Sequence, residues 1–176
     1  MNITKRLIRK ILRDCQRVRA DSHQSSVPTA KLLICFPFDE LRQKIALRIF
    51  NPVFRQYQTQ CICLMPENTH DLLPVSHLVG TIFIAPPADL QKEPLLPPEI
   101  SAKIRAQRYR IAVDLNSQFH PYSAAAVLQS GAPKRIGFHV AAADKFFNIQ
   151  ISRVESDPVE SAYQSIFKLI ADDLKT

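Results

Sequence analysis

The apolar residues of this chain form short continuous runs that alternate with stretches of helical spacing. Five mainly apolar runs, KLLICF, QCICLM, GTIFIA, RIAVDL and KRIGFH, occupy residues 31–36, 60–65, 80–85, 110–115 and 134–139. Runs of this length are typical of strands that are covered on both faces, as in a parallel sheet. The pattern therefore predicts a single α/β domain, with a mostly parallel sheet of about five or more strands and helices on both faces.

Helical spacing fills the segments between these runs. In residues 39–57, apolar side chains recur every fourth position, at Leu41, Ile45, Ile49, Val53 and Tyr57. Pro52 should kink or divide that helix, whereas the prolines that open residues 97–107 suit a first helical turn. In the last segment Asp157 is a good N-cap and Pro158 fits the first helical position. We expect this C-terminal helix to dock on the domain.

The first residues form a separate amphipathic pattern. One side of the predicted helix is apolar and consists of Ile3, Leu7, Ile8, Ile11, Leu12, Cys15 and Val18. The opposite arc is basic and consists of Lys5, Arg6, Arg9, Lys10, Arg13, Arg17 and Arg19. The chain thus divides into a basic amphipathic helix at residues 1–20, a linker of small and polar residues at 21–30, and a Rossmann-like α/β domain at 31–176.

The net charge is concentrated in this helix. The formal charge is +7, and residues 1–20 contain seven basic residues against Asp14 alone, so the helix carries +6 of it. The apolar side could pack on the domain and leave the charges in water, or the helix could lie on an anionic membrane surface. Nucleic acid is a third partner, which the absence of aromatic residues among the charges disfavours.

Composition also bears on the compartment. No run approaches the roughly 18 apolar residues that cross a bilayer, and the N-terminus lacks the features of a secretory signal. The four cysteines show no metal-type spacing, and Cys61 and Cys63 would face the same side of a strand. We predict a cytoplasmic protein with reduced thiols, and the basic helix adds the inner face of the cytoplasmic membrane as an alternative location.

Several kinds of chemistry lack their sequence signatures. The chain has only three glycines, so neither a dinucleotide-binding turn nor a nucleotide triphosphate loop can be formed. Its five histidines include no metal-binding pair, and no serine has the flanking glycines of a nucleophile elbow. We therefore expect no cofactor and no metal.

One stretch resembles a known family. Residues 108–138 run from a strand ending in VDL through a polar turn and a small-residue helix ending in SGAPKR to a strand containing IGF. This order resembles the N-terminal domain of the heptosyltransferases, glycosyltransferase family nine, and NPVFRQY within residues 31–57 adds a weaker match. The resemblance implies the first of two Rossmann-like domains in enzymes of bacterial lipopolysaccharide synthesis. That domain receives the lipid-linked sugar acceptor, and the second, donor-binding domain is absent from this sequence.

The resemblance also points to a missing catalytic base. The family carries a Gly-Asp pair after its first strand, and this aspartate is thought to deprotonate the acceptor. Counted back from Pro52, the pair falls on Ile45 and Ala46, which cannot accept a proton. The nearest carboxylates, Asp39 and Glu40, are candidate catalytic substitutes, although Asp39 could equally cap the following helix.

The candidate acceptor-binding residues follow the fourth predicted strand. Asp114, Asn116 and Ser117 would lie at its carboxyl end, where parallel sheets bind ligands. The same residues could instead satisfy the backbone of the turn. Gly131 is predicted to end the next helix with a positive φ.

Two functions compete on these grounds. The favoured one is a non-catalytic or degenerate heptosyltransferase-like, acceptor-side domain that serves as a binding module at a membrane surface or in envelope assembly. Its partners would be an anionic membrane surface, a lipid-linked sugar, another protein or a second copy of the chain. The alternative is a glycosyltransferase half, active in lipopolysaccharide or other envelope glycan synthesis, whose donor-binding domain comes from another chain.

Overall fold

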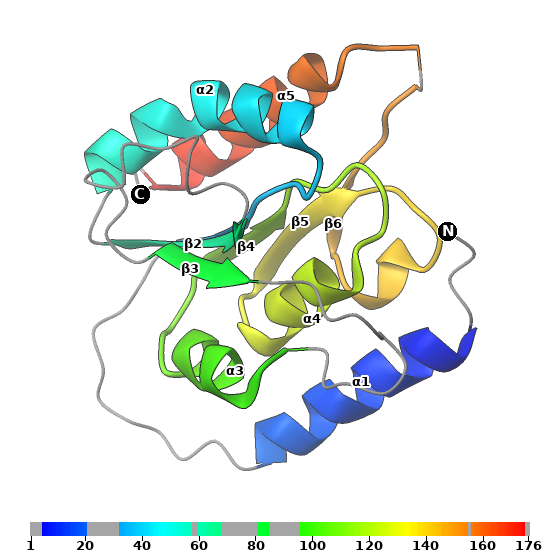
Figure 1. The fold of residues 1–176 in the computed structure, drawn as a ribbon. Coiled ribbons are helices and arrows are strands. Elements are labelled where there is room, and N and C mark those ends of the chain that lie inside the picture. The colour runs from blue at the N-terminus through cyan, green and yellow to red at the C-terminus, as the bar shows by residue number, and fades with distance from the viewer. Residues whose placement is uncertain are drawn as a thin grey trace.

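Six parallel strands form one sheet in the computed structural model (Figure 1). The structure describes residues 5–20, 32–57, 60–67, 81–84, 96–154 and 156–174. The strands are β1 (Leu32–Cys35), β2 (Cys61–Pro66), β3 (Thr81–Ile84), β4 (Ile111–Asp114), β5 (Lys134–Phe138) and β6 (Ile149–Ile151). Their order is β3-β2-β1-β4-β5-β6, and every neighbouring pair is parallel. The predicted parallel α/β fold is confirmed.

Helices cover both faces of this sheet. They are α1 (Lys5–Ala20), α2 (Glu40–Tyr57), α3 (Pro98–Arg105), α4 (Pro121–Gln129) and α5 (Val159–Leu174). Figure 1 shows α2 and α5 side by side on one face, with α1, α3 and α4 on the other. Alternate residues of each strand pack toward the two layers: Leu32 and Ile34 of β1 face α2 and α5, whereas Leu33 and Cys35 face the opposite layer.

The predicted strand boundaries agree with the structure to within one residue. The sixth strand, β6, was not predicted, because it is only three residues long and its side chains are half-buried. Pro52 does not divide the second helix, since α2 continues through it. The proline is exposed, so the carbonyl four residues earlier, left without its helical N–H partner, can be hydrated. The predicted linker at 21–30 and the segment between β2 and β3 fall outside the described residues.

The basic helix α1 packs on the domain. Ile11 and Cys15 are buried against α4, and the partly buried Leu7, Ile8 and Leu12 join the same core. The Cys15 thiol lies 3.9 Å from the carbonyl oxygen of Ala125 in α4. The predicted apolar side of α1 is therefore used in packing; Ile3 and the side chain of Val18 fall outside the described residues.

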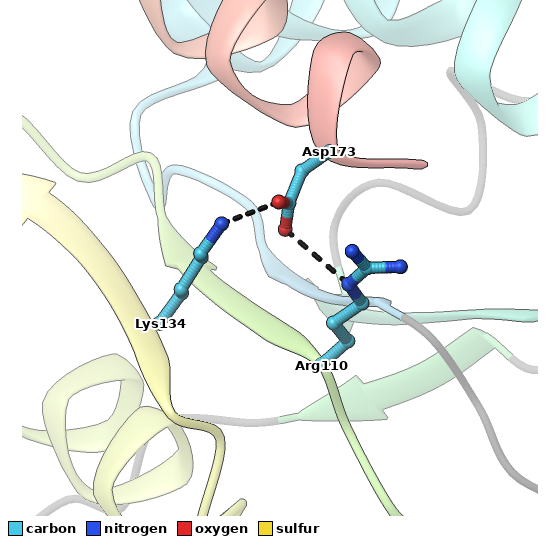
Figure 2. Close-up of polar contacts among 3 residues, drawn as sticks. All are labelled: Arg110, Lys134 and Asp173. Atoms are coloured by element: carbon cyan, nitrogen blue, oxygen red, sulfur yellow. Dashed lines mark hydrogen bonds and ion pairs between the residues drawn. The ribbon is translucent and has the colours of Figure 1, made fainter. Parts of the chain in front are cut away.

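Ion pairs and a tyrosine hold α5 at both ends of the sheet. Near its C-terminus, the Asp173 carboxylate binds the ammonium of Lys134 and lies 3.6 Å from Nε of Arg110 (Figure 2). These two cations stand at the amino ends of β5 and β4. Near its N-terminus, the buried Tyr163 hydroxyl donates to the carbonyl oxygen of Leu115 at 2.8 Å. The helix is thereby fixed along the strand direction.

Two glycines have conformational or steric roles. Gly131 has a φ of 65° just after α4, which confirms the predicted helix end. Gly137 lies in β5 against the ring of Phe147, and a Cβ atom there would approach that ring to 2.6 Å. The strand therefore needs glycine at this position.

Replacing Ile11 with alanine tests the docking of α1. Ile11 is fully buried, so Ile11→Ala should lower the free energy of unfolding by about 2–5 kcal/mol in urea denaturation. Leu169, whose side chain is 44% exposed on α5, is the control, and Leu169→Ala should cost only about 0.5 kcal/mol. Equal losses for the two variants would mean that α1 does not pack on α4 in solution.

Candidate functional site

The strand order reverses direction between β1 and β4. From β1 the chain proceeds outward through β2 to β3, and from β4 it proceeds the other way through β5 to β6. The helices that follow these two central strands, α2 and α4, lie on opposite faces of the sheet (Figure 1). In open parallel sheets, ligands bind outside the carboxyl ends of the strands at this kind of reversal. We call residues 36–39 and 114–123 here the switch-point site.

The side chain of Asn116 joins the two halves of the switch-point site. Its Oδ1 accepts a hydrogen bond from the backbone N–H of Phe38 at 3.1 Å, and its Nδ2 lies 3.3 Å from the carbonyl oxygen of Phe36. The same Nδ2 lies 2.7 Å from Oδ1 of Asp114 and 2.9 Å from Oγ of Ser123. One amide therefore ties the loop after β1 to β4 and to the first turn of α4.

Asp114 is part of this internal network. Its side chain is buried, and Oδ1 accepts from both the backbone N–H and the side-chain amide of Asn116. Burial raises the pKa of Asp114 to about 7, although the hydrogen bonds from Asn116 act in the opposite direction. Asp114 and Asn116 are two of the predicted acceptor-binding residues. Their side chains thus form hydrogen bonds with each other and with the backbone.

The two predicted catalytic carboxylates also have local partners. Asp39 follows β1 and is exposed, and its Oδ1 accepts from the backbone N–H of Arg42 at 2.9 Å, which caps α2. Glu40 is exposed and pairs with the ammonium of Lys44 at 2.7 Å, one turn along α2. Asp39 therefore lies in the switch-point site, whereas Glu40 forms a surface ion pair on α2.

The two positions set against the family's Gly-Asp pair are helical. Ile45 and Ala46, reached by counting back from Pro52, lie inside α2 and not in the turn after the first strand. The residues that follow β1 lead instead to Phe38 and Asp39. Asp39 is the first acidic residue after β1.

Ser117 and His120 complete the loop that follows β4. The Ser117 hydroxyl is enclosed and has no hydrogen-bond partner among the described residues. The His120 ring stacks on Phe38, with ring centroids 3.7 Å apart and an interplanar angle of 14°. Burial lowers the pKa of His120 to about 4, so the imidazole is neutral at pH 7. Phe38 and His120 were not predicted; the histidine directly before the first proline of α4 was the available signal.

Gln43 is a second polar residue that the sequence reasoning missed. It lies in the first turns of α2 and is fully buried, and neither amide atom has a hydrogen-bond partner among the described residues. It occupies the same helical face as Ala46 and Phe50, both buried. A polar residue on an otherwise apolar face was the sequence signal that could have found it.

The loop after β1 lacks the glycines of a phosphate cradle. Phe36 and Pro37 are buried there, and the half-buried Phe38 follows them, where dinucleotide-binding folds have glycines. Close approach of phosphate to the backbone requires small residues. Within the described ranges, no three His, Cys, Asp or Glu residues gather as metal ligands would. The polar groups at this site can donate and accept hydrogen bonds.

The predicted basic residues lie away from the switch-point site, on α1. Lys5, Arg6, Arg9 and Arg13 are exposed, and Lys10 is half-buried. For Arg17 and Arg19 the structure describes the helical backbone alone. None of the described helices has the combination of length and apolarity that a membrane crossing requires.

Comparison of the chain with protein-family models, with curated proteins and with solved structures finds no match.

The buried carboxyl of Asp114 gives the first test of the site. Its pKa is about 7 in the folded protein and about 3.9 in an unfolded chain, so between these values the folded state binds more protons. The contribution of Asp114 to stability should therefore fall as pH rises from about 4 to about 7. Asp114→Asn removes the titration, and its unfolding free energy relative to wild type should rise steadily over that window.

Urea denaturation at a series of pH values measures this difference. Asp39→Asn is the matched control, because Asp39 is exposed and asparagine caps a helix equally well. A difference between wild type and Asp114→Asn that does not change with pH would show that Asp114 is ionised throughout.

Proposed function

We propose that this chain is a non-catalytic, heptosyltransferase-like acceptor-side domain that binds a sugar-bearing ligand without transferring a group to it. The observation that carries the proposal is the bonding of Asp114 and Asn116 at the point where the strand order reverses. A general base must have a lone pair directed at the substrate. Asp114 instead is buried and accepts twice from Asn116, which favours a structural role for this acid.

The shape of the loop after β1 supports binding without donor chemistry. Transfer from a nucleotide-sugar needs a place for two phosphates. Buried Phe36 and Pro37 occupy the backbone turn where a phosphate would approach. Sugar hydroxyls both donate and accept hydrogen bonds, so they complement the Ser117 hydroxyl and the neutral His120. Because the Ser117 hydroxyl is enclosed, the ligand in this proposal reaches it when the loop after β4 shifts. Aromatic surface on Phe38 provides an apolar contact for a sugar ring.

The ligand that the family resemblance suggests is a lipid-linked sugar. In this proposal the protein works at the cytoplasmic face of the membrane, in the assembly of a bacterial envelope glycan such as lipopolysaccharide. Another protein or a second copy of the chain would then act with it. The lipid part of the ligand stays in the bilayer, and only its sugar reaches the switch-point site.

A glycosyltransferase half is the second candidate, and one observation favours it. Asp39 is exposed directly after β1, where the resemblance implies a catalytic aspartate. The cap of α2 uses Oδ1 of Asp39, and in this alternative the carboxylate also faces the ligand. In that case a separate chain would have to provide the donor-binding domain.

Titration with nucleotide-sugars tests whether the chain binds a donor by itself, which the non-catalytic proposal excludes. If the chain is a binding module, isothermal calorimetry with a panel of nucleotide-sugars should show neither binding nor hydrolysis. A Kd near or below about 100 μM, which corresponds to roughly −5.5 kcal/mol, would contradict the non-catalytic proposal. It would favour the transferase alternative, with Asp39 as the first residue to replace.

A soluble sugar ligand tests binding itself. Deacylated inner-core oligosaccharide of lipopolysaccharide should bind with a Kd of about 1 mM or tighter, or about −4 kcal/mol. Ser117→Ala removes a hydroxyl that has no partner among the described residues, and it should weaken binding about fivefold while the unfolding midpoint stays unchanged.

Ser165→Ala is the control for that experiment. Ser165 is exposed on α5, and its hydroxyl donates to its own helix, so this change should leave affinity unaltered. Absence of oligosaccharide binding, or equal affinities for the two serine variants, would refute ligand binding at the switch-point site.

A further inference from the structure

The outward side of α1 is a compact basic surface on a helix that is already folded and packed. Lys5, Arg6, Arg9 and Arg13 are exposed along it, and Asp14 is the single acidic residue of the helix. The Asp14 Oδ1 lies 3.9 Å from Nε of Arg13. One exposed ion pair of that length neutralises little of the basic surface.

The apolar side of α1 packs against the protein interior. Ile11 and Cys15 are buried against α4, with Leu7, Ile8 and Leu12 beside them. A helix that inserted into a bilayer would have to leave α4 and expose that core. The packing therefore leaves charge, and not apolar insertion, as the means by which α1 can bind a partner.

We propose that the exposed basic face of α1 docks this domain on an anionic lipid surface while the helix remains packed on α4. Anionic headgroups attract juxtamembrane basic residues, each by about a fivefold gain in partitioning, over a range set by the ionic strength. The attachment is reversible and depends on salt. Figure 1 shows α2 and α5 on the face of the sheet opposite α1, so in this orientation they would point away from the lipid.

The residue types of α1 favour lipid over nucleic acid. Single-stranded nucleic acid is bound by basic grooves with aromatic side chains on which bases stack, and α1 contains no aromatic residue. The described basic residues lie along the outward side of one helix. The cations from Lys5 to Arg13 span about 12 Å along the axis, which suits several headgroups of one leaflet.

Charge reversal at two positions tests the proposal without disturbing the fold. Arg6→Glu and Arg9→Glu change exposed side chains, and the new carboxylates would lie four residues before Lys10 and Arg13. Acidic residues early in a helix and acid-to-base pairs at this spacing stabilise helices. The double variant should therefore keep α1 folded, which circular dichroism and the urea midpoint would confirm.

Co-sedimentation with vesicles provides the measurement. Full-length protein should bind vesicles in which about a third of the lipid is phosphatidylglycerol, and should bind pure phosphatidylcholine poorly. Binding should weaken as salt rises from about 0.1 M to about 1 M, because the screening length falls from about 10 Å to about 3 Å. The R6E/R9E variant should lose about 25-fold or more in partitioning, at roughly fivefold per basic side chain.

The matched control carries the same charge change on the opposite face. Arg55 of α2 and Lys168 of α5 are exposed, and R55E/K168E should retain most of the vesicle binding. Equal losses in the two double variants would mean that net charge, and not α1, is responsible, and would overturn the proposal. So would failure of the full-length protein to bind anionic vesicles at low salt, binding that persists at about 1 M salt, or binding to a nucleic-acid oligomer but not to vesicles.

This inference does not rest on the proposed sugar site. The vesicles carry no sugar ligand, and the oligosaccharide used for the switch-point site carries no lipid, so either experiment can fail while the other succeeds.

Discussion

The central constraint on this fold is the buried amide of Asn116. It joins the loop after β1 to the loop after β4, whose helices leave the sheet on opposite faces, beside the Leu115–Cys35 backbone hydrogen bond and the stacking of Phe38 on His120. The amide accepts from Phe38 and donates toward Asp114 and Ser123, so it satisfies buried polar groups from three segments. Removing one partner of such a network leaves the others unsatisfied, at about 1–3 kcal/mol each. The bonds that join these two loops therefore determine which polar atoms remain for a ligand.

Some polar atoms of this loop bond within the protein and others have no described partner. This explains why the predicted acceptor-binding residues do not all have the role expected of them. Asp114 and Asn116 are close enough in sequence for either a ligand site or a self-satisfied turn. In the structure Asn116 bonds to Asp114 within the turn, which is the self-satisfied arrangement. Ser117 and His120 lie in the same loop but hold polar atoms that have no described hydrogen-bond partner. A sequence gives the residue types, whereas the allocation of each hydrogen bond depends on backbone geometry across β1 and β4.

The fold was more predictable than the site for a related reason. Buried parallel strands require continuous apolar runs, and a run such as KLLICF shows this locally, so β1 was found to within one residue. The strand β6 was missed because half-buried edge residues carry a weaker pattern. The stacking of His120 on Phe38 joins residues 82 positions apart, and no local pattern encodes it. Similarly, an amphipathic pattern predicted α1 but left open what would cover its apolar side.

The helix α4 connects the two surfaces on which the functional proposals rest. At its start, Ser123 accepts from Asn116 in the switch-point site, and two residues later the carbonyl of Ala125 meets the thiol of Cys15 in α1. Ala124, Ala125 and Ala126 are fully buried, and small side chains let α1 and the sheet approach α4 closely from its two sides. A larger residue there would displace α1, the sheet or both. The small residues of α4 thus have a structural role. They set the distance between α1 and the sheet, and so position the basic face of α1 relative to the switch-point site.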